Sequence, residues 1–298
     1  MAHSYKTTCP SCGHISLYVT PHNGMGHCFR PVCKHTEFNG SVARKERVRS
    51  DNVPEIRQIY KEAAWYYHSS LDEKARAYLH QRGFTDKTIE ELQIGYAPVG
   101  MLPLYRDPIA KEAGIATTKH EAFLGDRITF PYFKDANTIT DIRGRAIDPN
   151  EELKYKSPFG DVIFRGAIYP YNYHLNASQH IIIAEAEIKA DIAYQLGYAA
   201  MGLPGIGSWR PGFVQNEKQR VTIVFDNESN PETQRSVIAA VRKVAGELIK
   251  PYIAVLPIFD GEKKAEIDTF VNKYGGALFS SVIDNALTFK EWNRLQTF

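Results

Sequence analysis

The stretch HIIIAEAEIKADIAYQ, from His180 to Gln195, joins a short apolar run to a helical pattern. The run Ile181 to Ala184 is apolar throughout and has the length of a buried strand. Ile188, Ile192 and Leu196 then recur at four-residue steps, as residues on one face of a helix do. A strand, a helix and a second short strand form the unit from which parallel sheets are built. The stretch therefore predicts an α/β fold with helices on the faces of a parallel sheet.

The same plan recurs between Arg220 and Ile249, where RVTIVFDNESNPETQ passes from a strand through acidic residues into a helix. Glu185 falls at the end of the first strand, and Asp226 and Glu228 follow the second. Ligands bind at the carboxyl ends of parallel strands, so these three carboxylates are expected to converge. They repel one another unless a cation neutralises them, and their hard oxygen atoms suit Mg²⁺ or Mn²⁺. The alternative is a helix-capping turn, because residues 227–231 are rich in turn formers.

All four cysteines lie near the N-terminus, at Cys9, Cys12, Cys28 and Cys33. Two pairs with two and four intervening residues, separated by fifteen, are typical of two thiolate knuckles that close a tetrahedral zinc site. Disulfides would need an oxidising compartment, and the first residues show no secretory signal, so we expect a cytoplasmic protein. Four thiolates leave no open position on the metal, so this zinc is expected to be structural. Three flanking histidines could replace one ligand: His14, His27 and His35.

The overall charge balance limits how this chain can meet nucleic acid. Its 298 residues include 36 basic and 34 acidic side chains, a formal net charge of +2. Any contact with nucleic acid must therefore be local. The segment ARKERVRS, residues 43–50, concentrates positive charge directly after the cysteines, as a solvated linker or a phosphate-contacting arm would. No apolar run approaches the roughly 18 residues that a membrane span needs.

The middle of the chain combines helical patterns with strands that carry basic residues. Helices are predicted from Val53, after Asp72 and after Thr85, and GDRITFPYF (residues 125–133) predicts a half-buried strand. Arg143 and Arg145 are two residues apart, so on a strand they share a face suited to phosphates. Tyr and Phe interleave with the basic residues, as on single-strand-binding surfaces, although an ordinary charged sheet is the alternative. The basic set is Arg127, Arg143, Arg145, Lys154 and Lys156.

These features occur in one order that resembles bacterial-type (DnaG-like) DNA primases, and also the primase half of phage helicase-primases. The resemblance rests on the cysteine module, AYLHQRGFTDKTIEELQIGYAP (residues 77–98), DRITFPYFKDANTITDIRGRA (126–146), KYKSP (154–158) and the acidic strand ends. It implies a zinc-binding domain that reads single-stranded DNA, tethered to an RNA polymerase domain with a TOPRIM catalytic fold. NTPs would be substrates, Mg²⁺ or Mn²⁺ catalytic cofactors, and a replicative helicase a candidate partner.

The implied domains are a zinc ribbon at 1–42, a basic linker at 43–52, a mixed α/β subdomain at 53–175 and a TOPRIM subdomain at 176–298. By position, Glu185 resembles the TOPRIM glutamate, and Asp226 with Glu228 resembles its Asp-x-Asp metal pair. Glu266 and Asp268 resemble a later acidic pair that also binds magnesium, and the basic set would hold template and nucleotide phosphates.

This chain also departs from the family pattern. Ala186 stands where glycine is usual, Lys189 where aspartate is usual, and Glu228 and Glu266 replace aspartate. Glutamate still coordinates Mg²⁺, whereas Lys189 removes a possible ligand and adds a cation. The rival functions are a TOPRIM nuclease, which uses the same carboxylates to cut DNA, and a DNA-binding scaffold without catalysis.

The cysteine spacing makes a direct prediction about metal content. The purified protein is expected to contain about one zinc ion per chain, because four thiolates complete one tetrahedral site. Elemental analysis, combined with thiol titration before and after chelation, measures this. No zinc, together with four freely titrating thiols, would exclude the site.

Overall fold

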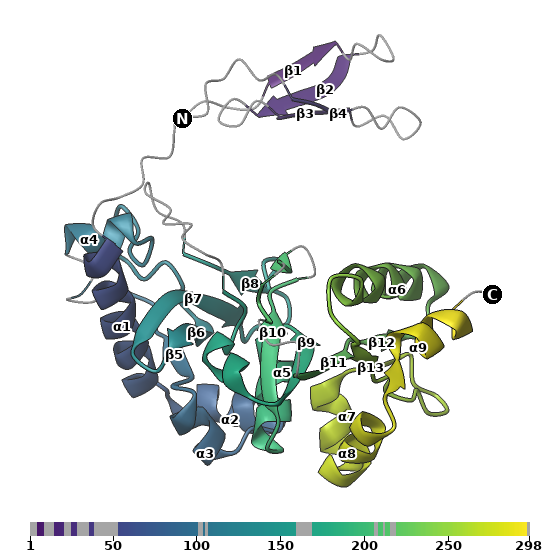
Figure 1. Cartoon of the computed structure of the whole chain (residues 1–298). Helices are drawn as coiled ribbons and strands as arrows, with labels where there is room; N and C mark the ends of the chain where they lie inside the picture. Colours follow the sequence, from purple (N-terminus) through teal and green to yellow (C-terminus); the bar gives the residue numbers. More distant parts are fainter. Residues whose placement is uncertain are drawn as a thin grey trace. The chain divides into compact units, whose positions relative to one another are not determined.

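A computed structural model describes the backbone of residues 5–8, 15–20, 25–28 and 36–38, and then residues 53–100, 104, 107–158, 169–205, 208–210, 212–214 and 219–296 (Figure 1). Side chains are described from residue 54 onward. The chain divides into two compact units, Met1–Ser50 and Asp51–Phe298.

The first unit contains a four-stranded antiparallel sheet in the order β1-β2-β3-β4. Cys28 is the last residue of β3, and its side chain lies outside the described residues. Cys9, Cys12, Cys33 and the basic linker 43–52 also lie outside them. The zinc site therefore stays a prediction. The strands are β1 (Tyr5–Thr8), β2 (Ile15–Thr20), β3 (Met25–Cys28) and β4 (Thr36–Phe38).

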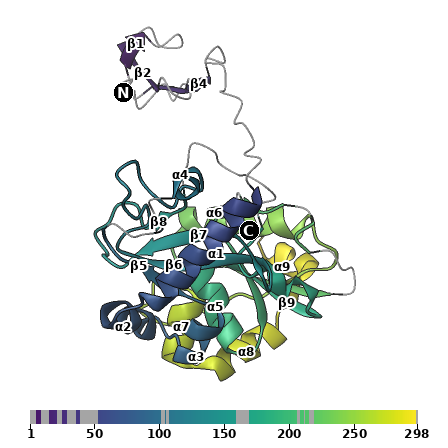
Figure 2. The ribbon, with the colours of Figure 1, turned by 90° about the vertical axis from the view of Figure 1, so that its left-hand side faces the viewer.

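The second unit begins with helix α1 (Val53–Ser69), which packs across an antiparallel sheet (Figure 2). The sheet has the order β5-β6-β7-β8. Ile56, Ile59, Ala63 and Tyr67 share the buried face of α1. The strands are β5 (Gly95–Ala97), β6 (Arg127–Asp135), β7 (Thr138–Ala146) and β8 (Tyr155–Lys156), and a short helix α4 (Pro108–Glu112) lies between β5 and β6 in sequence.

Strand β6 is more buried than its sequence suggests, so the prediction of a half-buried strand is wrong. Every residue from Arg127 to Tyr132 is buried. Ile128, Phe130 and Tyr132 join the core that also contains Tyr171, and the alternate residues lie on the face that α1 covers. The polar residues of this strand are therefore enclosed rather than exposed to solvent.

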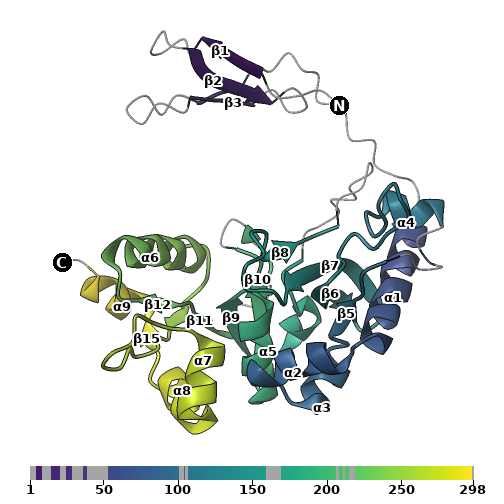
Figure 3. The ribbon, with the colours of Figure 1, turned by 180° about the vertical axis from the view of Figure 1, so that it is seen from behind.

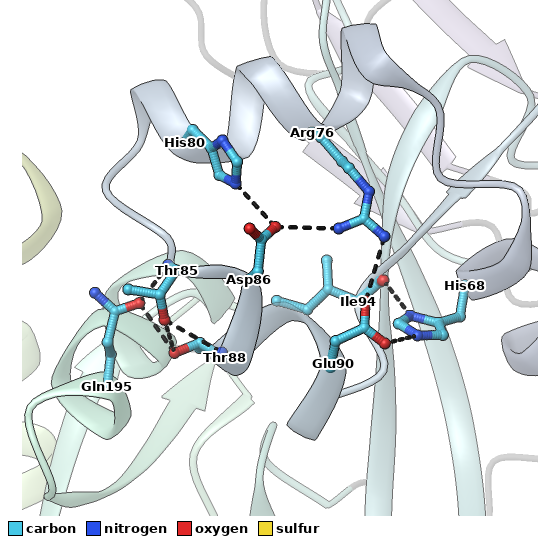
Figure 4. Close-up of polar contacts among 9 residues, drawn as sticks. All are labelled: His68, Arg76, His80, Thr85, Asp86, Thr88, Glu90, Ile94 and Gln195. Atoms are coloured by element: carbon cyan, nitrogen blue, oxygen red, sulfur yellow. Dashed lines mark hydrogen bonds and ion pairs between the residues drawn. The ribbon is translucent and has the colours of Figure 1, made fainter.

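Helices α2 (Glu73–Gln81) and α3 (Asp86–Glu91) begin at the predicted N-caps. The Asp72 carboxylate accepts a hydrogen bond from the Ala75 amide at 2.8 Å, and the Thr85 hydroxyl accepts one from the Thr88 amide at 3.3 Å. Arg76 bridges Asp86 and Glu90, which ties the two helices together (Figure 4). The predicted helix starts are confirmed.

The second half of the chain forms a five-stranded sheet in the order β10-β9-β11-β13-β15. Its first four strands are parallel, and β15 runs antiparallel to β13. The predicted parallel sheet is therefore confirmed. Its strands are β9 (His180–Glu185), β10 (Ala199–Leu203), β11 (Arg220–Val224), β13 (Tyr252–Ile253) and β15 (Leu287–Thr288). A separate two-stranded pair is formed by β12 (Asn227–Glu228) and β14 (Lys264–Ala265).

Helices cover both faces of this sheet, which explains the continuous apolar run of β9. Ile182 and Ala184 belong to the core formed with α5, α7 and α8, whereas Ile181 and Ile183 belong to the core formed with α6 and α9. Helix α5 lies against β9 and β10 and also contacts α3 and α7 (Figure 3). The helices are α5 (Glu187–Gln195), α6 (Pro231–Ala245), α7 (Ile267–Tyr274), α8 (Gly276–Asp284) and α9 (Phe289–Leu295), and a 3₁₀ turn η2 (Tyr173–Ala177) precedes β9.

Gln195, in the last turn of α5, fastens α3 to this layer. Its side-chain oxygen accepts hydrogen bonds from the Thr85 amide at 2.7 Å and the Thr88 hydroxyl at 2.9 Å (Figure 4). Its amide nitrogen donates to the Gly83 carbonyl at 2.9 Å. Among the described residues, none of the helices has the length and apolar character that crossing a bilayer requires.

The turn between β9 and α5 holds Ala186 in a strained conformation. Its φ of 65° and ψ of 175° lie in a region that only glycine adopts readily. The Ala186 carbonyl also lies so close to β10 that a Cβ on Gly202 would come within 2.6 Å of its oxygen. The backbone at this turn is therefore fixed by packing against β10.

Ala186→Gly is expected to stabilise the protein by about 1 kcal/mol, because relief of strain exceeds the added entropy of the unfolded chain. Ala190→Gly is a matched control, since Ala190 lies inside the same helix and should lose about 1 kcal/mol or more. Urea unfolding of both variants measures the difference. Equal destabilisation by the two changes would contradict a strained Ala186.

Candidate active site

Three acidic residues meet at one edge of the parallel sheet. Strand β9 ends at Glu185, and Val224 of β11 pairs with Ala184, so Asp226 lies at the same edge. In the antiparallel pair β12–β14, Asn227 faces Ala265, which sets Glu266 beside Asp226. Of the three carboxylates predicted to converge, Glu185 and Asp226 therefore lie at this edge, and Glu266 joins them. Glu228 lies in β12 opposite Lys264, and its place in a shared metal site stays a prediction.

The cation between these carboxylates is Lys189, from the first turn of α5. Its Nζ lies 2.6 Å from both carboxylate oxygens of Asp226 and 3.4 Å from Oε1 of Glu266. Lys264 approaches the other oxygen of Glu266, Oε2, at 2.8 Å. The Lys189 residue is only 9% exposed, whereas the Lys264 side chain is 49% exposed. One buried ammonium thus joins two carboxylates from separate segments of the chain.

The charges of this group shift the pKa values of its members. Burial alone would lower the pKa of Lys189, but Asp226 and Glu266 outweigh it and hold that pKa above the ordinary value. Burial and the charges of Glu185 and Glu266 raise the pKa of Asp226, and Lys189 opposes that shift. Burial alone would raise the pKa of Glu266, but Lys264 and Lys189 outweigh it and lower that pKa to about 2. Lys189 is therefore protonated at neutral pH.

The carboxylates differ in how well they would fit a divalent ion. Both oxygens of Asp226 already bind Lys189, so the Asp226–Glu266 pair does not fit an added Mg²⁺ as it is folded. Glu185 and Glu228 make no ion pair with any described residue, and their oxygens suit Mg²⁺. Across the described ranges, no three Asp, Glu, His or Cys side chains are grouped to hold one metal ion.

Asp268, a sequence-predicted ligand, takes part in a different interaction. It lies in the first turn of α7, is 1% exposed and forms an ion pair with Arg82 at the end of α2. It could join a metal site only if Arg82 gave up this pair. Removal of one partner from a buried ion pair leaves an uncompensated charge, so that exchange is costly.

Arg143 and Arg145 share one face of β7, as their spacing predicts. Both guanidinium groups lie over the ring of Tyr155, at 4.4 and 5.1 Å from its centroid. Arg145 also donates to the Tyr78 hydroxyl at 2.7 Å and to the Tyr155 hydroxyl. These aromatic contacts fix the orientation of both cations.

Glu187, which the sequence did not single out, connects this basic face to α5. It is fully buried, and its Oε1 accepts hydrogen bonds from Arg143 Nη1 at 3.0 Å and from the Tyr132 hydroxyl. Its other oxygen, Oε2, is buried without a hydrogen-bond partner among the described residues. Glu187 is one of three charged residues in α5, so its charge alone did not distinguish it in the sequence.

The other basic residues have different environments. Arg127 is buried, donates to the Leu153 carbonyl at 3.0 Å and pairs with Glu151 at 3.1 Å. Lys156 lies over the Phe123 ring at 4.0 Å from its centroid, and burial, with the charge of Arg127 adding to it, lowers its pKa. Lys154 is exposed. A phosphate-binding role for these three stays a prediction.

Comparisons with known proteins agree with this arrangement. Residues 64–176 match the family model described as DNA primase catalytic core, N-terminal domain. The DNA primase of Staphylococcus epidermidis is 26% identical over 264 residues, and that of Clostridium acetobutylicum 24% over 277. The matches cover 78% and 85% of this chain but only 42% and 45% of the relatives. The chain therefore spans about half the length of the curated relatives it matches.

Solved structures show the same fold. A DnaG catalytic core superposes with a TM-score of 0.63 and 21% identity, covering 78% of this chain and 80% of that one. The Aquifex aeolicus primase, with zinc-binding and RNA polymerase domains, gives a TM-score of 0.62 and 16% identity over 97% of this chain and 80% of its own. A DnaG primase catalytic domain bound to single-stranded DNA gives 0.61, with 19% identity, over 79% and 82% of the two chains. The resemblance to DnaG-like bacterial DNA primases is confirmed in sequence and in fold.

Asp141 shares the face of β7 that holds Arg143 and Arg145. Burial raises the pKa of the Asp141 carboxyl to about 7, and the charge of Glu187 acts in the same direction. The hydrogen bond from the Ile142 amide and the charge of Arg143 act to lower this pKa. Because the neutral carboxyl is favoured in the folded protein, its contribution to stability is fully present below the unfolded pKa and is lost as pH rises through about 7.

Asp141→Asn should therefore stabilise the protein more at high pH than at low pH. Its gain in unfolding free energy over wild type is expected to grow by about 1–2 kcal/mol between about pH 5 and about pH 8. Urea unfolding at the two pH values measures this, with the exposed Asp260→Asn as control. A gain that does not depend on pH would contradict the raised pKa.

Proposed function

We propose that the protein synthesises short RNA primers on a single-stranded DNA template. The observation that carries this proposal is the combination of a primase-like fold with carboxylates at the carboxyl edge of the parallel sheet. The relatives are DNA primases, and one solved relative has single-stranded DNA bound. The reaction would be nucleotidyl transfer, in which a primer 3′-hydroxyl attacks the α-phosphate of an NTP and pyrophosphate leaves.

The basic face would position the template and nucleotide phosphates. Arg143 and Arg145 are oriented by Tyr155 and present planar guanidinium groups, which match phosphate geometry. Lys154 and Lys156 would add positive charge for binding the same phosphates. Holding both reactants in place supplies a large share of the rate increase in transfers of this kind.

Glu185 and Glu228 would hold the catalytic Mg²⁺ or Mn²⁺, since their carboxylates are free of the described ion pairs. When bound, the ion would lower the pKa of the attacking hydroxyl and balance charge on phosphate oxygens. Asp226 would act on the same centre by holding Lys189 beside it. Roles for Glu266 and Asp268 as further ligands would require Lys189 and Arg82 to move.

The N-terminal cysteine module would carry a structural zinc ion and read the template sequence, as the resemblance implies. A zinc ribbon at 1–42 and a TOPRIM subdomain at 176–298 are the proposed domain identities. Synthesis of primers for replication would place the protein in the cytoplasm, with a helicase as a candidate partner. The main rival is a nuclease that uses the same carboxylates.

Glu185→Gln tests the assignment, because it keeps the side-chain shape and removes one charge. Primer synthesis on single-stranded DNA with labelled NTPs and Mg²⁺ is expected to fall about 100-fold or more. Zinc content and DNA affinity should stay near wild type, and the exposed Asp284→Asn should retain activity. Shortened DNA from the wild-type protein would support the nuclease instead, and full activity of Glu185→Gln would refute the proposed centre.

A further inference from the structure

We infer that Lys189 is the resident cation of the Asp226–Glu266 pair and fills the place that a divalent ion would otherwise take there. The inference depends on the proposed function only where it calls this group of carboxylates a catalytic centre. Its test measures metal binding and not primer synthesis. The position of Nζ, in contact with both oxygens of Asp226 and near Glu266, carries it.

Charge balance explains why this position needs a cation. Asp226 and Glu266 are 12% and 14% exposed at their side chains, and Glu185 adds a third negative charge close enough to raise the pKa of Asp226. Buried like charges are unfavourable unless an opposite charge lies between them. Lys189 supplies that charge from within the chain, so the group needs no added ion in order to fold.

The surroundings of Lys189 also resist its displacement by a metal. The residue is 9% exposed and belongs to the first turn of α5, where the strained turn at Ala186 is fixed against β10. An ion that entered between Asp226 and Glu266 would meet the ammonium at short range, and like charges in a poorly solvated site repel strongly. Lys264 already binds the outer oxygen of Glu266.

The consequence is a catalytic centre that takes fewer divalent ions than its carboxylates alone would allow. Binding is left to the carboxylates without an ion pair, Glu185 and Glu228. Lys189 would then keep its positive charge near Glu185, whose own charge helps to raise the pKa of Lys189. Replacing the lysine with a carboxylate should recreate the missing metal position.

Metal binding to the whole 298-residue chain tests the inference. Lys189→Asp is expected to bind Mn²⁺ about ten-fold or more tightly than wild type, or to bind one additional ion, in calorimetric and electron paramagnetic resonance titrations. Lys273→Met is the matched charge control, because Lys273 is an exposed lysine paired with Glu262. It should bind Mn²⁺ as wild type does.

Thermal unfolding provides a second measurement in case Lys189→Asp folds poorly without metal. Lys189→Met leaves Asp226 without its cation and Glu266 with Lys264 alone, so Mg²⁺ should raise its Tm by about 5 °C or more beyond the rise seen in wild type. Equal Mn²⁺ affinity and stoichiometry in wild type and Lys189→Asp, or equal Mg²⁺ shifts in wild type and Lys189→Met, would overturn the inference. If the wild-type protein makes no primers but the metal results are as expected, the proposed function is refuted and the inference about Lys189 stands.

Discussion

The ion pair between Lys189 and Asp226 holds the carboxyl edge of the five-stranded sheet together. It joins the first turn of α5 to the end of β11, and its second contact, to Glu266, adds the segment that leads into α7. These segments follow β9, β11 and β14, so the buried cation fixes the ends of three strands relative to one another. Removing one partner of such a pair leaves a buried charge uncompensated, which is why the site depends on it.

Helix α5 connects the basic residues of β7 to the carboxylates at the edge of the parallel sheet. Glu187 faces Arg143 on the basic sheet, Lys189 faces Asp226 at the parallel sheet, and Asp191 accepts hydrogen bonds from Tyr171 and Asn172, each at 3.2 Å. Three charged residues at two-residue steps thus point to three different partners. A shift of this helix would move Arg143 and the carboxylate group together.

Local patterns in the sequence predicted the elements well. The apolar run of β9, the caps at Asp72 and Thr85, and the shared face of Arg143 and Arg145 all follow from spacing of neighbouring residues. The sequence did not reveal the pairing of Lys189 with Asp226, 37 residues away, or that of Asp268 with Arg82. Such pairs form only after the sheet brings distant segments together. The burial of Arg127 was missed for the same reason, since its guanidinium group contacts Glu151 and the Leu153 carbonyl, which lie more than 20 residues away in the sequence.

The position of a bound metal tests this account most directly. A crystal of the protein soaked in Mn²⁺ can be measured at the manganese absorption edge, where anomalous density identifies the ion. The account predicts manganese at Glu185 and Glu228, with Lys189 still bound to Asp226. A manganese ion between Asp226 and Glu266, with the Lys189 ammonium displaced, would contradict it.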